Sequence, residues 1–199
     1  MKKILIASGN QHKITEIKSV LKDIQNIEIL SLKDFCVVIK VIEDGKTLND
    51  NALKKAKEIH NVFGIPTIAD DTGLFVDALN GDPGVYSARY AGESSSYSDN
   101  CIKLLKNLEN ISIEKRTARF ESVLCFHINH KSIFFFKGIC EGKIINEPRG
   151  KNGFGYDPLF IPDGFDLTFA EMIDEQKNKI SHRGIALEEL TKFLNNNSG

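Results

Sequence analysis

The stretch IPTIADDTGLFVDAL, residues 65–79, sets two adjacent acids, Asp70 and Asp71, between apolar runs. The apolar residues before Asp70 predict a buried strand that stops at the acids, and FVDAL is a candidate for another strand. Two neighbouring carboxylates repel each other, which raises the pKa of at least one unless a cation lies beside them. The pair therefore indicates either a strand end with one solvated acid and one turn acid, or a cation site.

A hard divalent ion such as Mg²⁺ would remove the repulsion between Asp70 and Asp71, because it takes oxygen ligands readily. Glu43 ends another apolar run and is the natural third oxygen donor. On the acid pair alone, the solvated strand end is the more frequent arrangement. Mg²⁺ is thus a candidate cofactor, and other motifs of the chain must decide whether a metal site is present.

Composition bounds the class of protein. At 199 residues and 41% hydrophobic, the chain can bury an ordinary core as one domain, or as one domain with a lobe. A net charge of -1 gives no overall basic field, so we expect no nucleic-acid partner. The four cysteines form no C-x-x-C pair, which is typical of free thiols in a reducing compartment and makes zinc unexpected. The N-terminal apolar run is too short for a signal peptide and no run has transmembrane length, so we expect a soluble cytoplasmic protein without a membrane partner.

Apolar periodicity predicts alternating helices and strands. Strands are predicted within residues 3–9, where the strand runs into a turn, and at 27–30, 35–42, 66–70, 117–129 and 133–145, the last two as a long β-hairpin. Helices are predicted over 14–24, from the cap Thr47 with its capping-box partner Asp50 through Asn61, from Ser98, from the Thr168–Glu171 capping box, and from Ser181. Because helix-separated and hairpin-linked strands both occur, the fold class is α/β with a mixed sheet.

Two loops carry possible ligand contacts. SGNQHK, residues 8–13, lies between the first strand and its helix, where free N–H groups and the helix dipole favour anions, and Lys13 adds a charge. RGKNGFGYDP, residues 149–158, combines glycines that admit a ligand close to the backbone with Phe154, whose ring can stack on a base. Taken singly, a helix-capping turn and a glycine-rich β-turn remain the simpler interpretations.

Cations near the start of a helix form a third motif. ISHRG, residues 180–184, places His182 and Arg183 in a first helical turn, where positive charge opposes the helix dipole unless acceptors face it. A solvated arginine in a capped turn is about equally consistent with this string. Lys55, on the helix after Glu43, could reach a phosphate, although a solvated helix face is the simpler interpretation.

The order of these motifs is more specific than any one of them. SGNQHK, IED before TLNDNALKKA, IADDTGL, PGVYSARYAG, GFGYDPLF and ISHRGIAL together resemble the inosine triphosphate pyrophosphatase family, from Ile4 to about Leu190. The resemblance implies Mg²⁺-dependent hydrolysis of a nucleoside triphosphate to the monophosphate and pyrophosphate, with preference for deaminated purines such as ITP, dITP and XTP. It also implies a homodimer, and one domain over 1–199 with a long curved mixed sheet and two lobes around a central cleft.

The resemblance also assigns the site, residue by residue. Glu43 and Asp71 become the metal ligands, and Asp71 the proposed proton acceptor. Beside the resemblance, Asp70 and Lys13 are further catalytic candidates, Asp70 as an alternative acceptor and Lys13 as a positive charge near the phosphates. Substrate contacts are assigned to Ser8, Gly9, Asn10, Gln11, His12, Lys13, Lys55, Thr72, Phe154, Gly155, Tyr156, Asp157, Lys177, His182 and Arg183. Ser8, Thr72 and Asp50 depart from the residues frequent in the family, but each keeps the hydroxyl or the charge.

These residues support water attack without a covalent intermediate. Asp71 or Asp70 would accept the proton, while Lys13, Lys55 and the loop amides would offset charge on the leaving pyrophosphate. His182 and Arg183 would donate to the 6-carbonyl of hypoxanthine or xanthine, a group that adenine lacks. Two alternatives stay open: a phosphatase with an aspartyl nucleophile, and a non-catalytic nucleotide-binding or RNA-binding module.

Overall fold

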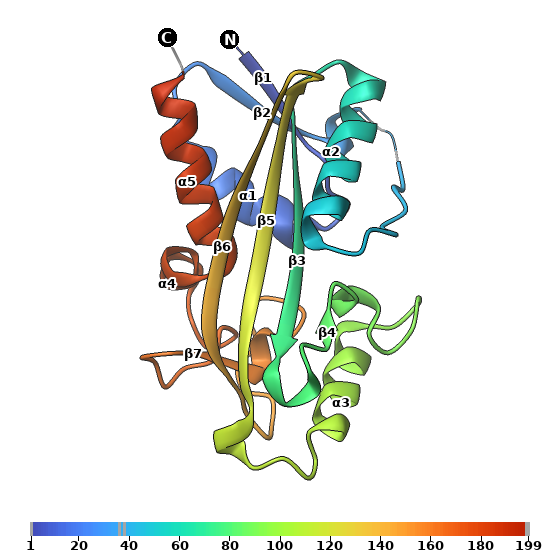
Figure 1. The fold of residues 1–199 in the computed structure, drawn as a ribbon. Coiled ribbons are helices and arrows are strands. Elements are labelled where there is room, and N and C mark those ends of the chain that lie inside the picture. Colours follow the sequence, from blue (N-terminus) through green and yellow to red (C-terminus); the bar gives the residue numbers. More distant parts are fainter. Residues whose placement is uncertain (1, 36, 38, 198–199) are drawn as a thin grey trace. The chain divides into compact units, whose positions relative to one another are not determined.

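The computed structural model describes residues 2–35, 37 and 39–197 and has an α/β fold. These residues form a mixed sheet in the order β2-β1-β3-β5-β6-β7, with β4 paired to β3 (Figure 1). Its strands are β1 (Lys2–Ile6), β2 (Ile27–Ser31), β3 (Thr67–Val76), β4 (Pro83–Gly84), β5 (Thr117–Asn129), β6 (Ser132–Ile144) and β7 (Phe160–Pro162). The helices are α1 (Gln11–Leu21), α2 (Leu48–Phe63), α3 (Tyr97–Asn107), α4 (Asp174–Ile180) and α5 (His182–Asn196). The expected fold class is confirmed.

The sheet is mixed for the predicted reason. β1 pairs in parallel with both β2 and β3, strands that follow it only after intervening helices. β5 and β6 are neighbours joined by two residues, which confirms the hairpin. β6 then pairs antiparallel with β7.

Contacts between residues divide the chain into two compact units. The first comprises the residues up to Asp71, Ser122–Gly138, and the chain from Arg183 onward. The second comprises Thr72–Glu121 and Ile139–His182. β3, β5 and β6 therefore each contribute residues to both units.

The first unit has a core between its strands and two helices. α1 and α5 pack their apolar faces on β1, β3 and β5, and Figure 1 shows α2 on the other side of these strands. The buried residues of this core are Ile4, Ile6, Ile14, Ile17, Leu21, Ile24, Ile68, Leu124, Phe126, Ala186, Leu187, Leu190 and Leu194. The predicted periodicity of α1 is thereby confirmed, although the helix ends at Leu21.

α2 begins and ends where its capping residues predict. The Thr47 side chain accepts from the backbone of Asp50 and the Asp50 side chain accepts from the backbone of Thr47, which completes the capping box. Gly64 takes the left-handed conformation, with φ of 65°, that glycine adopts without steric cost and that ends many helices. The cap thus fixes the helix that carries Lys55.

The second unit has its own core, which is rich in aromatic rings. Phe120, Phe160 and Phe169 contact one another, with ring centroids between 4.8 and 6.0 Å apart. Leu104 and Leu108, at and just beyond the end of α3, are buried against this cluster. The core supports the loop that precedes β7.

The strand around the two acids differs from the prediction. β3 runs without a break from Thr67 to Val76, so Asp70 and Asp71 lie inside a strand and not at its end. Residues 77–79 form a 3₁₀ turn instead of part of a second strand. The strand continues because β3 also pairs with β5 and with β4, whereas its pairing with β1 stops at Ile68. The acids therefore follow the point where β1 ends.

Three other element predictions were wrong in part. α3 is capped by Ser96, whose capping box uses Asp99, and so begins before Ser98. Thr168 and Glu171 do exchange hydrogen bonds, but these close a turn, and the next helix begins at Asp174. Of the strand predicted at 35–42, residues 37 and 39–42 are not in a strand, whereas Cys36 and Val38 lie outside the described residues.

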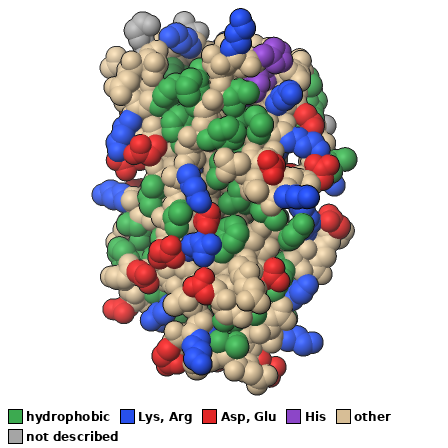
Figure 2. Space-filling view, in the orientation of Figure 1, with side chains coloured by type: hydrophobic (Ala, Val, Ile, Leu, Met, Phe, Trp, Pro, Cys, Tyr) green, Lys and Arg blue, Asp and Glu red, His purple; other side chains and the backbone are tan. Residues whose placement is uncertain are grey.

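Acidic and basic side chains are interspersed over the face drawn in Figure 2. Cys101, Cys125 and Cys140 are free thiols. Within the described part of the chain, every helix is too short or too polar to span a bilayer.

Candidate active site

The loop after β1 is shaped by Asn10, which caps α1. Its Oδ1 accepts from the backbone N–H groups of His12 and Lys13 at 3.0 and 3.4 Å, and its own N–H donates to Ser8 Oγ at 3.1 Å. The capping interpretation of this loop is therefore correct for Asn10. The same cap directs the first turn of α1 so that Lys13 reaches the acid pair, with 2.7 Å between Lys13 Nζ and Asp70 Oδ2.

Asp70 is a buried carboxylate surrounded by donors. Besides Lys13, it accepts from Arg183 Nη2 and Nε at 3.0 and 3.2 Å and from Ser122 Oγ. Burial disfavours the charged form of Asp70, but Arg183 and Lys13 outweigh burial and hold its pKa well below the usual range. Asp70 is therefore ionised and fully engaged, which is unsuitable for a proton acceptor.

Asp71 has a different environment. Its Oδ1 accepts from Lys55 Nζ at 2.7 Å and its Oδ2 from Asn51 Nδ2 at 3.2 Å. Burial and the charge of Glu43 raise the pKa of Asp71, although Lys55 and Lys13 oppose them. A carboxylate with a raised pKa is a better base than Asp70, so Asp71 is the stronger candidate for proton transfer.

Glu43 lies close to Asp71, as its assignment requires. Lys55 Nζ donates to Glu43 Oε1 at 3.0 Å while it also donates to Asp71. Burial opposes the charge of Glu43, but Lys55 lowers the pKa of this carboxyl below its usual value. Both acids raise the pKa of Lys55 against the effect of burial. The two carboxylates thus already draw one cation to a shared point.

The geometry explains why two acids stand side by side. Successive residues of a strand point to opposite faces of the sheet. Asp70 accordingly faces Lys13 of α1 and Arg183 of α5, whereas Asp71 faces Lys55 of α2. The acids do not crowd one shared point, because each has its own cation on its own face.

Three contributors were not identified from the sequence. Asn51 donates to Asp71 and accepts from the backbone N–H of Gly45 at 2.8 Å, so it links α2 to the loop after Glu43. Glu16 binds the Nη1 of Arg183, and Ser122 binds Asp70. Asn51 could have been found from the sequence, because it is a polar residue one helical turn before Lys55 on the face of α2 that is buried. No sequence signal pointed to Glu16 or Ser122, because their partners, Arg183 and Asp70, are more than fifty residues away in the sequence.

The assigned residues of the second unit gather around Asp157. Its Oδ2 accepts from Lys177 Nζ and from the backbone N–H of Phe154, both at 2.8 Å. The Lys177 ammonium also lies 5.0 Å from the centre of the Phe154 ring. Asp157 therefore fixes the glycine-rich loop and, through Lys177, one face of the ring proposed to stack on a base.

Tyr156 and His182 are buried in the second unit. The Tyr156 hydroxyl donates to the Ser87 carbonyl at 2.9 Å, which indicates a part in holding the loop. The His182 ring stacks on Phe120, with centroids 4.7 Å apart and planes 14° from parallel. Thr72 follows Asp71 in β3, and Gly155 O accepts from Cys101 Sγ.

The assigned residues thus belong to two groups, one in each unit. The first-unit residues are Ser8, Gly9, Asn10, Gln11, His12, Lys13, Glu43, Lys55, Asp70, Asp71 and Arg183. Hydrogen bonds and ion pairs link the acids and cations among them, whereas the Gln11 side chain contacts Thr15 and Lys33. The second-unit residues are Thr72, Phe154, Gly155, Tyr156, Asp157, Lys177 and His182.

A pair of glycine substitutions tests the loop around Asp157. Gly153 and Gly155 both have positive φ, 71° and 64°, so alanine strains either backbone. A Cβ on Gly153 would lie 2.1 Å from Asp157 Oδ2, whereas one on Gly155 meets nothing within 4 Å. We expect Gly153→Ala to lower the melting temperature clearly more than Gly155→Ala. Equal melting temperatures for the two variants in a thermal scan would contradict the role given to Asp157.

The residues present fit a magnesium ion. Mg²⁺ in proteins is held by one or two carboxylates and completes its octahedral shell with water and substrate phosphates. Glu43 and Asp71 supply two carboxylates that already share one cation. No group of three acids, histidines or cysteines in the described residues is arranged as a complete metal cage. The donor set therefore suits an ion that arrives with phosphate ligands.

Fold and site together define an α/β protein that gathers acids and lysines in the manner suited to a polyanion and a divalent ion. The sequence matches the model of the Ham1 family over residues 4–193, and the chain belongs to that family. This confirms the family inferred from the motifs.

Several relatives match over nearly the whole chain. A dITP/XTP pyrophosphatase of Desulfotalea psychrophila is 49% identical over 187 residues, which span 94% of this chain and 82% of that protein. A dITP/XTP pyrophosphatase of Thermoanaerobacter pseudethanolicus is 47% identical over 192 residues, 96% of each chain. The solved structure of a HAM1 protein from Coxiella burnetii matches with a TM-score of 0.89 at 39% identity, covering 98% of this chain and 100% of that chain.

Proposed function

We propose that the protein is a dITP/XTP pyrophosphatase, which hydrolyses deaminated purine nucleoside triphosphates to the monophosphate and pyrophosphate and so cleanses the nucleotide pool. The observation that carries this proposal is the setting of Asp71, a buried acid with a raised pKa that shares Lys55 with Glu43. Asp71 as the base, Glu43 and Asp71 as oxygen ligands, and Lys55 as a phosphate-binding cation thereby lie next to one another. The relatives named above support the same activity.

The residues of the first unit have separate tasks in this proposal. Glu43 and Asp71 would hold Mg²⁺, which would orient the phosphates and lower the pKa of a water. Asp71 would accept the proton of the attacking water. Lys13, Lys55 and the N–H groups at the start of α1 bind phosphate oxygens and offset the charge of the leaving pyrophosphate. Asp70 holds Lys13 in place.

The residues of the second unit are proposed to bind the base and sugar. Phe154 supplies a stacking face, and Lys177 and Asp157 fix its position. Base preference is assigned to His182 and Arg183 as donors to the 6-carbonyl. A guanidinium has five N–H groups, and three of those on Arg183 bind Asp70 and Glu16. Base contact by Arg183 would therefore compete with these ion pairs and require an exchange of partners.

We further propose that the enzyme is a homodimer and acts in the cytoplasm. The dimer follows from the family resemblance. The free thiols of Cys101, Cys125 and Cys140 are consistent with a reducing compartment.

The activity test measures pyrophosphate and orthophosphate separately. Purified protein with ITP, dITP or XTP and Mg²⁺ should release one pyrophosphate per monophosphate, and EDTA should stop the release. A non-catalytic binding module would release neither product. An aspartyl-nucleophile phosphatase would release orthophosphate and leave a trapped phosphoaspartate, and either result would overturn the proposal.

Arg183→Lys tests base reading in the same assay. Lysine keeps the positive charge beside Asp70 but loses the planar fork of donors. We expect the ratio of kcat/KM for ITP over ATP to fall about tenfold, because a lost hydrogen bond to the base costs about 1–3 kcal/mol. An unchanged ratio in a folded variant would remove Arg183 from base recognition.

A further inference from the structure

A pocket lies in the first unit at the amino ends of β1 and β3, away from Asp70 and Asp71. It is a cavity of about 450 Å³ lined at the amino ends of β1 and β3 and by residues of β5 and α5. Its apolar wall includes Ile4, Phe126, Ile128, Phe193 and Leu194. Lys13 and Asp70 lie beyond the carboxyl end of β1, so none of the proposed catalytic groups lines this pocket.

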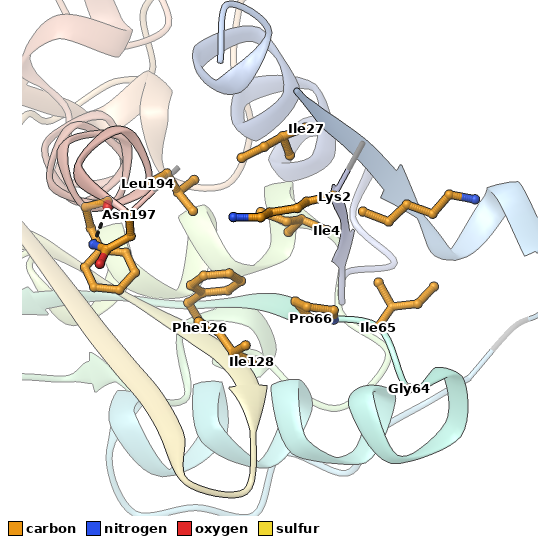
Figure 3. A pocket seen from close by; sticks show the side chains of 12 residues that line it. Lys2, Ile4, Ile27, Gly64, Ile65, Pro66, Phe126, Ile128, Leu194 and Asn197 are labelled. Carbon is orange, nitrogen blue, oxygen red and sulfur yellow. Dashed lines mark hydrogen bonds between the residues drawn. The ribbon is translucent and has the colours of Figure 1, made fainter. Parts of the chain in front are cut away.

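The pocket has a size and a lining typical of a small-molecule site. Ligand pockets usually measure roughly 300–1,000 Å³ and are mainly apolar with few polar groups. Figure 3 shows Ile4, Phe126, Ile128 and Leu194 around one space. An apolar chain in this space would be removed from water on several sides.

Two lysines, Lys2 and Lys3, are among the residues that line the pocket, and Lys2 is the one on the face of Ile4. Lys2 and Ile4 share a face of β1, because alternate residues of a strand point the same way. Figure 3 shows the Lys2 side chain extending from β1 across the pocket towards α5. No acid of the described residues forms an ion pair with Lys2. Lys3, in contrast, forms one with Glu28, with 3.8 Å between Lys3 Nζ and Glu28 Oε2. The pocket therefore combines an apolar wall with an ammonium that has no carboxylate partner among those residues.

We propose that this pocket binds a free medium-chain fatty carboxylate, with the alkyl chain on the apolar wall and the carboxylate on Lys2. Charge complementarity selects an anion over a neutral or cationic amphiphile. The size of the pocket limits the chain to a medium length. This site is separate from the proposed pyrophosphatase site, so either can fail without the other.

Calorimetry with octanoate and decanoate below their micelle concentrations tests the proposal on the full chain. We expect saturable binding with one site per chain, and about a threefold to fourfold gain in affinity per added CH₂. Octylammonium, with the same chain and the opposite charge, should bind at least tenfold more weakly than octanoate. Absence of saturable decanoate binding, or equal binding of the two octyl compounds, would overturn the proposal.

Neighbouring lysines provide the matched variants. Lys2→Gln should weaken octanoate binding at least fivefold, whereas Lys3→Gln should change it less than twofold. Ile128→Trp should fill the pocket and remove binding, with the melting temperature confirming that the variant is folded. Pyrophosphate release should be unchanged in both lysine variants. Equal effects of the two lysine changes, or Lys2-dependent binding to anionic phospholipid vesicles without binding of free decanoate, would show that the pocket does not take a fatty carboxylate.

Discussion

Replacing Asp71 by asparagine should reduce pyrophosphate release from ITP at least about 10³-fold, because the amide neither accepts the proton nor provides an anionic metal ligand. The fold should survive the change. Burial and Glu43 already raise the pKa of Asp71, so its surroundings tolerate an uncharged side chain of the same shape. Lys55 keeps Glu43 as a partner. Initial rates at saturating Mg²⁺ and a thermal scan measure both effects.

Asp44→Asn is the control for Asp71→Asn. Asp44 follows Glu43, and its side chain is exposed and pairs only at the surface with Lys54 at 2.6 Å. Removing this charge should alter the rate less than twofold. A folded Asp71→Asn variant that retains a tenth or more of the wild-type rate would exclude Asp71 as the base and return the question to other acids.

Local signals predicted the parts of the fold that local chemistry decides. The capping box of Thr47 and Asp50 and the left-handed Gly64 place α2. The long alternation of residues 117–129 places β5. These elements are set by neighbours in the sequence, so the residues alone were sufficient.

Strand pairing was not predictable in the same way. The acids of β3 seemed to end a strand because charge rarely continues a buried run. β3 continues because β4 and β5 pair with it, and β5 is distant in the sequence. The failed helix after Thr168 has a similar cause, since a capping box satisfies backbone groups without requiring that a helix follow.

The site was predicted as a set of residues but not as an arrangement. The motifs identified Asp70, Asp71, Lys13, Lys55 and Arg183, which the structure brings together. They did not reveal that the two acids face opposite sides of the strand, because that follows from β3 being continuous. Asp70 is held ionised by two cations on one face, whereas Asp71 on the other face has a raised pKa.

Replacing Arg183 by methionine should lower the free energy of unfolding by about 3–5 kcal/mol, because it breaks a buried ion pair and removes one of the two cations that hold the Asp70 charge. Arg183 and Asp70 are both buried, with 2% and 0% of their side chains exposed. Glu16 also loses its ion pair with Arg183. Urea unfolding measures the loss. Arg149→Met is the matched control, since Arg149 pairs with Glu171 at 3.2 Å with 44% of its side chain exposed and should cost about 0–1 kcal/mol.

The double variant Asp70→Asn with Arg183→Met locates the cost. If the loss comes from the buried Asp70 carboxylate without Arg183, making that residue neutral should recover part of it, although Glu16 still lacks its ion pair with Arg183. Lys13 would also lose its partner, so phosphate binding should weaken and KM for ITP should rise. A single Arg183→Met variant no less stable than Arg149→Met would mean that Lys13 and Ser122 suffice to hold Asp70 ionised. Arg183 would then be available to the base, and the exchange of partners required for base contact would carry little cost.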